Sequence, residues 1–200
     1  MGAAEFLEAS DYPDGFLLIP RTRIRLCRLV RSMSSERAAE ETFQPDSSSA
    51  LRIRFRSACT LVSSRLKGAG FSAEEYGCQV ECGAASGMAA AGIVQLMGGT
   101  AREAISAASS AIQNMLGLIC DPVADRVEVP CLGKNISAAM NALSSATMAR
   151  SGFDAVIPLE EVIQTVARVG EQMPACVKCT GSGGLSITET SIRIKERLRN

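Results

Sequence analysis

Three cysteines in different small-residue contexts carry the clearest chemical signal in this sequence. Cys78 stands where a helix is expected to begin, and Cys120 and Cys131 flank a short segment that contains prolines. Thiolates are the usual ligands of iron–sulfur clusters, and three of them suit one face of a 4Fe–4S cube. The fourth iron then stays open and can act as a Lewis acid on a hydroxyl leaving group. The pattern therefore indicates an enzyme, with inert core cysteine as the alternative for each residue taken alone.

The remaining cysteines near this pattern are less informative. Cys82 lies four residues after Cys78 on the same helical face, where core packing is favoured over a role as spare ligand. Cys176 and Cys179 form a CxxC pair, but a zinc site would need a second pair or histidines. Because the pair comes just before a glycine-rich turn, we expect it to lie near the cluster as a closing flap.

The composition excludes several classes of function. The 200 residues have a formal net charge of zero, no Trp and 4% aromatic residues, which argues against nucleic-acid binding. Histidine is absent, so this chain lacks the commonest general base, and its catalytic base is unknown. No apolar run is long enough to span a membrane. Eight cysteines without a signal-peptide pattern indicate a reducing, cytoplasmic location.

The chain divides into two parts by composition. Residues 1–67 are rich in Arg and Ser and are predicted to be irregular, with short marginal strands at 21–31 and 51–56, where Arg alternates with apolar residues. A basic arm that contacts RNA or membrane is the alternative, although nearby acidic residues argue against it.

Residues 68–200 are predicted to form a mainly α, cluster-binding domain. Its first long helix, around 85–97, is so rich in Ala and Gly that it must be buried on nearly every side. Thr100 and Glu103 form the pattern of a capping box for the next helix. We expect further helices over 136–150, from Pro158 to before Pro174, and over 192–199, with a loop over 116–134.

The motifs around these cysteines resemble the iron–sulfur-dependent L-serine dehydratase family, most closely the alpha subunit of its two-chain form. The resemblance covers about residues 70–195. The motifs that carry it are Gly77-Cys78-Gln79-Val80-Glu81-Cys82-Gly83, Met88-Ala89-Ala90-Ala91, the stretch from Asn114 to Cys120-Asp121-Pro122, Val127-Glu128-Val129-Pro130-Cys131, Gln172-Met173-Pro174 and Gly183-Gly184-Leu185.

The resemblance implies a cofactor, a reaction and a site. It implies a 4Fe–4S cluster held by Cys78, Cys120 and Cys131, and conversion of L-serine to pyruvate and ammonia without pyridoxal phosphate. Asn135, Gly183 and Gly184 are weaker candidates for orienting the substrate. The glycines could cradle a carboxylate through their N–H groups, or form a bare flexible turn. A beta subunit or a second copy of the chain is the implied partner. A non-catalytic cluster-binding module and an L-cysteine desulfidase-like lyase are the alternatives.

The sequence departs from the family pattern at several places. Residues 1–67 lack the family's upstream substrate-binding motifs and do not resemble it. Asp125-Arg126 stands where the family usually has Gly and an apolar residue, so a positive φ there would cost some energy. Cys176 and Cys179 replace Ala/Ser- and Glu-type residues.

Overall fold

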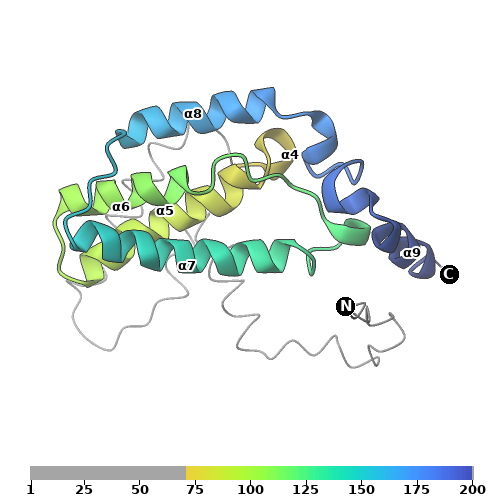
Figure 1. Cartoon of the computed structure of the whole chain (residues 1–200), viewed down its shortest axis with the longest axis horizontal. Helices are drawn as coiled ribbons and strands as arrows, with labels where there is room; N and C mark the ends of the chain where they lie inside the picture. The colour runs from red at the N-terminus through yellow and green to blue at the C-terminus, as the bar shows by residue number, and fades with distance from the viewer. Residues whose placement is uncertain (1–70, 200) are drawn as a thin grey trace, which may run out of the picture.

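The computed structural model describes residues 71–199, which contain helices and no β-strand (Figure 1). The prediction of a mainly α domain is confirmed, whereas the strands predicted at 21–31 and 51–56 lie outside the described residues. No helix in the described part is long and apolar enough to cross a membrane. The α-helices are α4 (Ala73–Tyr76), α5 (Cys78–Leu96), α6 (Ala101–Gln113), α7 (Cys131–Arg150), α8 (Leu159–Gln172) and α9 (Glu189–Arg197), with 3-10 turns η3 (Val123–Asp125), η4 (Ala175–Val177) and η5 (Gly184–Ile187).

Helix α5 is the centre of the bundle, with α6, α7 and α8 around it (Figure 1). Its small residues allow neighbouring backbones to come close. A Cβ added at Gly87, for example, would lie 2.8 Å from Cδ1 of Ile112 on α6. Such a contact is closer than real side chains tolerate, so the glycine is required by packing. The predicted burial of this helix on nearly every side is confirmed.

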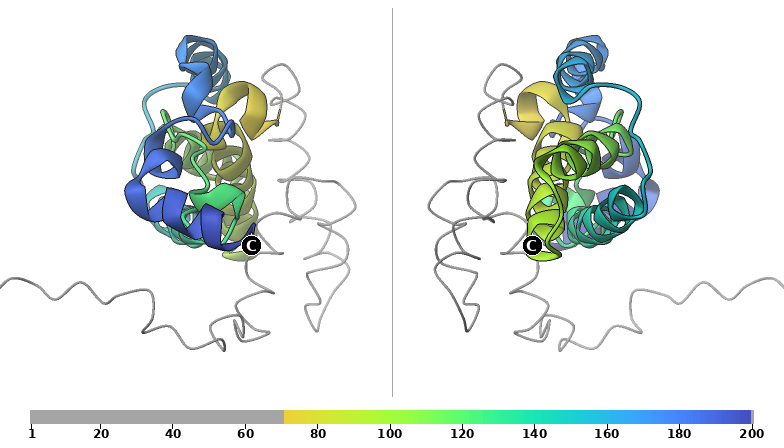
Figure 2. Two further views of the ribbon diagram at one scale, coloured as in Figure 1. Left: turned by 90° about the vertical axis from the view of Figure 1, so that its right-hand side faces the viewer. Right: turned by 90° about the vertical axis from the view of Figure 1, so that its left-hand side faces the viewer.

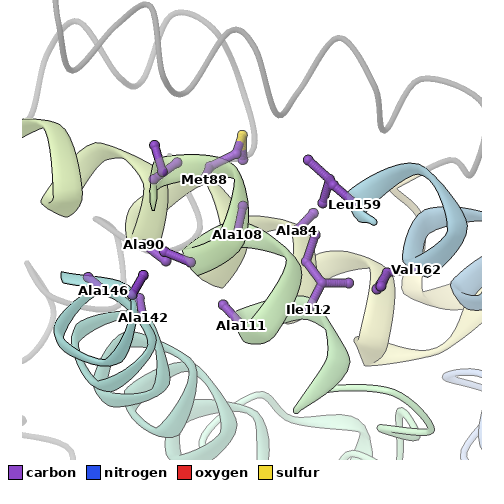
Figure 3. Close-up of a cluster of buried hydrophobic side chains, with 14 of the residues drawn as sticks. Ala84, Met88, Ala90, Ala108, Ala111, Ile112, Ala142, Ala146, Leu159 and Val162 are labelled. Atoms are coloured by element: carbon purple, nitrogen blue, oxygen red, sulfur yellow. The ribbon is translucent and has the colours of Figure 1, made fainter. Parts of the chain in front are cut away.

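The core is made mostly of alanines, with a few larger side chains that fill the spaces between helices (Figure 3). Leu159 and Val162 from α8 pack against Ile112 of α6 and against α5. The labelled members of this cluster are Ala84, Met88, Ala90, Ala108, Ala111, Ile112, Ala142, Ala146, Leu159 and Val162. Because alanine loses no rotamer freedom on burial, a core of this kind brings helix axes close at little entropic cost.

The capping box predicted for α6 is confirmed. The N–H of Glu103 donates to Thr100 Oγ1 at 3.2 Å, and the N–H of Thr100 donates to Glu103 Oε2 at 2.6 Å. The hydrogen bond from the Thr100 backbone N–H has the largest effect on the Glu103 carboxyl and lowers its pKa. Arg150 at the end of α7 also donates to Glu103 at 2.7 Å, which joins the two helix ends.

Two helices begin earlier than predicted. Helix α7 starts at Cys131 rather than near Ile136, with Pro130 as its N-cap residue. A proline is compatible with a helix start, because the first turn has no intrahelical partner for its N–H groups. Helix α9 starts at Glu189, since the side chain of Thr188 caps it by accepting from the N–H of Ser191. The loop that holds Cys120 is therefore shorter than expected.

Leu159→Ala should lower the free energy of unfolding by about 2–5 kcal/mol, because it leaves a cavity in the core. Leu159 is 0% exposed, whereas Leu143 on α7 is 47% exposed. Leu143→Ala is therefore the matched control, with an expected change within about 0.5 kcal/mol. Urea unfolding followed by circular dichroism measures both. Equal losses in the two variants would show that α8 does not contribute to the core as described.

Candidate functional site

The structure brings Cys78, Cys120 and Cys131 together at one end of the bundle. Cys78 is the first residue of α5 and Cys131 is the first residue of α7, while Cys120 lies in the connection that follows α6. Cys78 and Cys120 are buried and Cys131 is half-buried. The helix start expected at Cys78 is confirmed, and Cys131 turns out to begin a helix as well.

The two cysteine-bearing helices run in the same direction, which is why their first residues meet. Ser86 Oγ donates to the carbonyl of Ala138 at 2.8 Å, and the Cys82 thiol faces Asn135 Oδ1 at 3.9 Å. Residue numbers thus rise together along α5 and α7, as the ribbon shows (Figure 1). Both positive helix-dipole ends point to the same place, an arrangement that favours negatively charged groups there.

The thiols influence one another electrostatically in a connected series, which we call the thiol series. The Cys78 thiol interacts with those of Cys120 and Cys82, and the Cys120 thiol interacts with those of Cys131, Cys78 and Cys179. The pKa of Cys78 is raised to about 12. The hydrogen bond with Cys120 lowers it, but the hydrogen bond with Cys82, burial and the charge of Cys82 outweigh that effect. The hydrogen bond with Cys131 lowers the pKa of Cys120, but the hydrogen bond with Cys78, burial and the charge of Cys78 outweigh that effect, so the pKa of Cys120 is also raised.

This series of contacts differs from a mononuclear metal site. Across residues 71–199, no three Cys, Asp or Glu side chains gather around a point that one metal ion could occupy. A structural zinc ion needs four ligands in a closed tetrahedron. The cysteines instead line a surface shared by two helix starts and one loop.

The CxxC segment lies directly beside Cys120. The N–H of Cys120 donates to the carbonyl of Val177 at 2.8 Å, and the N–H of Cys179 donates to the carbonyl of Cys120 at 2.9 Å. These two bonds make an isolated parallel bridge between Cys120 and Lys178. The expectation that the CxxC pair lies near the other cysteines, ahead of the glycine turn, is confirmed.

A buried ion pair that sequence reasoning missed holds the Cys120 loop. Lys134 Nζ lies 2.5 Å from Asp121 Oδ1 and donates to the carbonyl of Ile119 at 2.7 Å. The side chains of Asp121 and Lys134 are only 4% and 14% exposed. The lysine charge also acts on Cys78, whose pKa it lowers by a smaller amount than the raising effects. The only indication of this ion pair in the sequence is that Asp121 and Lys134 each interrupt a stretch of apolar and small residues.

The glycine turn packs on this ion pair. The N–H of Leu185 donates to Asp121 Oδ2 at 2.9 Å, and a Cβ on Gly184 would lie 2.6 Å from the same oxygen. Gly184 has φ 58°, a conformation that glycine adopts without strain. A Cβ on Gly183 would lie 2.7 Å from the carbonyl oxygen of Cys176. Close approach therefore requires both glycines, and their contact with a substrate stays a prediction.

Asn135 positions protein groups at the site. Its Nδ2 donates to the carbonyl of Cys131 at 2.8 Å, and its Oδ1 faces the Cys82 thiol at 3.9 Å. The amide thus fixes the first turn of α7 against α5. Its role toward a substrate stays a prediction. Cys82, expected to be a core residue, is buried as predicted but also belongs to the thiol series through Cys78.

Gln79, directly after Cys78, anchors the start of α5. Its buried Nε2 donates to the carbonyls of Tyr76 and Val166, each at 3.0 Å, and its Oε1 accepts from the N–H of Gly117 at 3.0 Å. One side chain therefore joins α5, α8 and the segment that leads to Cys120. Gln79 can be buried because its polar atoms all have hydrogen-bond partners.

The loop from Cys120 to Cys131 is held from outside by the C-terminal segment, which lies in front of this end of the bundle (Figure 2, left). The N–H of Ala124 donates to Ser191 Oγ of α9 at 2.9 Å, and Lys195 Nζ lies 2.5 Å from Asp125 Oδ2. Ala124 and Asp125 have φ of 52° and 59°. The position of Asp125, where the resembled family has glycine, does require a left-handed backbone, and the contacts with α9 offset its cost.

Asp121→Asn should lower the free energy of unfolding by about 2–4 kcal/mol, because it leaves Lys134 buried without its counter-charge. Asp125→Asn is the matched control, since its carboxylate also lies 2.5 Å from a lysine but is 54% exposed. Its expected cost is below about 1 kcal/mol. Urea unfolding of both variants tests this difference, and equal costs would contradict the burial of the Asp121 pair.

The stability of the metal-free chain should fall as pH rises above about 9. The Cys78 pKa is about 12 in the folded state against a reference of 9.0, so the folded chain keeps a proton that the unfolded chain releases in this window. Urea midpoints at about pH 8, 9 and 10 should decline less steeply in Cys78→Ser than in the parent. Cys176→Ser, at an exposed cysteine, should keep the parental slope. Identical slopes in all three proteins would refute the raised pKa.

Known proteins match this chain over the same region. The sequence profile described as "Serine dehydratase alpha chain" matches residues 38–186. A probable L-serine dehydratase alpha chain of Bacillus subtilis (strain 168) is 45% identical over 130 residues, which are 65% of this chain and 43% of that protein. The L-serine dehydratase alpha chain of Peptoniphilus asaccharolyticus is 44% identical over 129 residues, 64% of this chain and 44% of that protein.

A larger relative matches over a smaller share of its own length. L-serine dehydratase 1 of Escherichia coli (strain K12) is 42% identical over 120 residues, 60% of this chain and 26% of that protein. The chain thus spans less than half the length of these three relatives. The profile match begins at residue 38, upstream of the boundary near residue 67 that composition predicts, and that boundary stays a prediction. Since the profile covers most of the sequence, the chain belongs to the serine dehydratase alpha chain family.

Proposed function

We propose that this chain is the cluster-binding part of an L-serine dehydratase, a lyase that converts L-serine to pyruvate and ammonia. The observation that carries the proposal is the meeting of Cys78, Cys120 and Cys131 at the N-termini of two parallel helices. Relatives named L-serine dehydratase support the substrate. The site offers thiols and no histidine, which suits an inorganic cofactor better than acid–base chemistry by this chain alone.

The residues present fit a 4Fe–4S cluster better than a single metal ion. Such a cluster binds Cys thiolates on different irons, so its ligands need not close around one point. The thiols of Cys78, Cys120 and Cys131 form such an open series. Lys134 and two helix dipoles supply positive charge beside them, which offsets the negative charge of three thiolates. When bound, the cluster would supply an open iron that acts as a Lewis acid on the serine hydroxyl.

The other residues of the site hold its geometry. Asp121 and Lys134 fix the backbone on both sides of Cys120, and Asn135 fixes the carbonyl of Cys131. We propose that Asn135, Gly183 and Gly184 also border the substrate, whose carboxylate would find backbone N–H groups near the glycine turn. We propose that a partner chain supplies the base for the α-proton.

The proposal includes a beta-type partner chain. The similar Bacillus and Peptoniphilus proteins are named alpha chains. Helix α7 carries no charged residue between Lys134 and Arg150, and its outer face exposes Ile136, Met140 and Leu143. An apolar, uncharged face of this kind is typical of a surface that another chain covers. A second copy of this chain is the alternative partner. The thiol series requires a reducing compartment, so a cytoplasmic location is part of the proposal.

A non-catalytic cluster-binding module is the second candidate function. The observation that favours it is that histidine is absent, so the chain itself lacks the commonest general base. This candidate predicts a bound cluster but no turnover with any partner.

Anaerobic reconstitution with iron and sulfide should give about four irons per chain and an air-sensitive visible absorbance. Cys120→Ser should lose the iron, because it removes the thiol at the centre of the thiol series. Cys176→Ser is the matched control and should keep the iron, since its thiol lies on the surface of the same segment. Iron and sulfide analysis with the visible spectrum measures each protein. Full iron retention in Cys120→Ser would refute the ligand assignment.

The reconstituted chain, mixed with a beta-type chain, is then assayed for pyruvate from L-serine and for sulfide from L-cysteine. Pyruvate formation supports the dehydratase, and sulfide release in its place would indicate the desulfidase-like alternative. A loaded cluster without either product supports the non-catalytic module.

A further inference from the structure

Cys179 lies at the site but is not one of the three proposed cluster ligands. We propose that Cys179 and Cys120 form an oxidation-sensitive thiol pair, which hydrogen peroxide converts to a disulfide when no metal is bound. This modification would remove Cys120 as a ligand and would be reversed by a dithiol. Its importance for iron binding rests on the proposed function, but the disulfide itself does not.

The backbone holds the two residues side by side. The N–H of Cys179 donates to the carbonyl of Cys120, and the N–H of Cys120 donates to the carbonyl of Val177. The bridge pairs Cys120 with Lys178, so Cys179 directly follows the residue that faces Cys120. The Cys179 thiol also helps to raise the pKa of the Cys120 thiol, as expected for two sulfurs near each other. Disulfides form only between residues whose backbones lie this close.

The contacts around the CxxC segment keep it in this register. The carbonyl of Cys176 lies against Gly183, where a Cβ would come within 2.7 Å. Thr180 Oγ1 donates to the carbonyls of Ala175 and Cys176, each at 3.2 Å. Cys179 itself has φ 62°, a conformation that these neighbours maintain. The segment is therefore a defined element of the site and places Cys179 reproducibly.

Exposure decides which sulfur reacts first. Cys179 is exposed, whereas Cys120 is 4% exposed. Among the thiols that influence the Cys120 thiol, Cys78 is buried and Cys131 is half-buried. Peroxide from solvent therefore meets Cys179 before the others. Oxidation of cysteine by peroxide follows thiolate character and access to the sulfur, and a sulfenic acid condenses with a neighbouring thiol.

The chemistry balances in two steps. The sulfur of Cys179 attacks hydrogen peroxide, an S–O bond forms, the O–O bond breaks, and one water leaves with the thiol proton. The sulfur of Cys120 then attacks the sulfenic acid, the S–S bond forms, the S–O bond breaks, and a second water leaves. Two thiols lose two electrons in total, and one peroxide accepts them.

Tryptic peptides separate the cysteines well enough to test the pairing. Cleavage after Arg and Lys places Cys120 in residues 103–126, Cys131 in 127–134, Cys176 in 169–178 and Cys179 in 179–193. The full metal-free chain is treated with a small excess of hydrogen peroxide, its remaining thiols are blocked, and the digest is analysed by mass spectrometry. We expect peptides 103–126 and 179–193 to be joined, and dithiothreitol to separate them. A link from Cys120 to another cysteine, or oxidised Cys179 without any link, would overturn the proposal.

Two variants make the test specific. Cys179→Ser should lose the link and leave Cys120 as a blocked thiol, while Cys176→Ser should keep the link, because Cys176 is exposed in the same segment. Circular dichroism checks that both variants fold. Loss of the link in Cys176→Ser would overturn the pairing of Cys120 with Cys179.

Iron uptake after oxidation separates this proposal from the proposed function. Peroxide-treated parent should take up no iron until dithiothreitol is added, whereas peroxide-treated Cys179→Ser should take up iron directly. If no protein takes up iron but the peptide link forms, the cluster assignment fails and the thiol pair stands. If iron uptake is normal and no link forms, the thiol pair fails alone.

Discussion

The close packing of α5 against α6 and α7 is the constraint on which the rest of the structure depends. Alanines and Gly87 let these helices approach to distances at which an added methyl group would collide with Ile112. Only this approach brings the start of α5 and the start of α7 to one place. The site is therefore a by-product of a small-residue core, and a larger side chain inside the bundle would act on the cysteines at its end.

The sequence predicts the helices well where local signals are strong. The Ala/Gly-rich helix and the capping box of Thr100 and Glu103 are local features, and the structure has both of them. The predicted start of α7 is wrong because Pro130, which the sequence places in a loop, directly precedes the helix. A proline gives the same local signal whether it lies within a loop or directly precedes a helix.

The three cysteines of the site can be predicted from the sequence, but the groups that hold them in place cannot. Contacts between Cys120 and the CxxC segment follow from the pairing of backbones far apart in the sequence, which no periodicity reveals. The same holds for Lys134 and Asp121, whose ion pair depends on how α7 meets the loop. Gly183 and Gly184 were recognised as a turn, but the need for glycine comes from the neighbouring Asp121 and Cys176.

The contact between the cysteine loop and α9 has a consequence for synthesis of the protein. The left-handed backbone at Ala124 and Asp125 is held by Ser191 and Lys195, which a ribosome adds much later. Domains form during synthesis from the N-terminal side at about 5–20 residues per second, so the earlier helices can pack first. Cys120 meets its full surroundings only after the segment around residue 195 has emerged. The proposed cluster would therefore be inserted after this segment has folded.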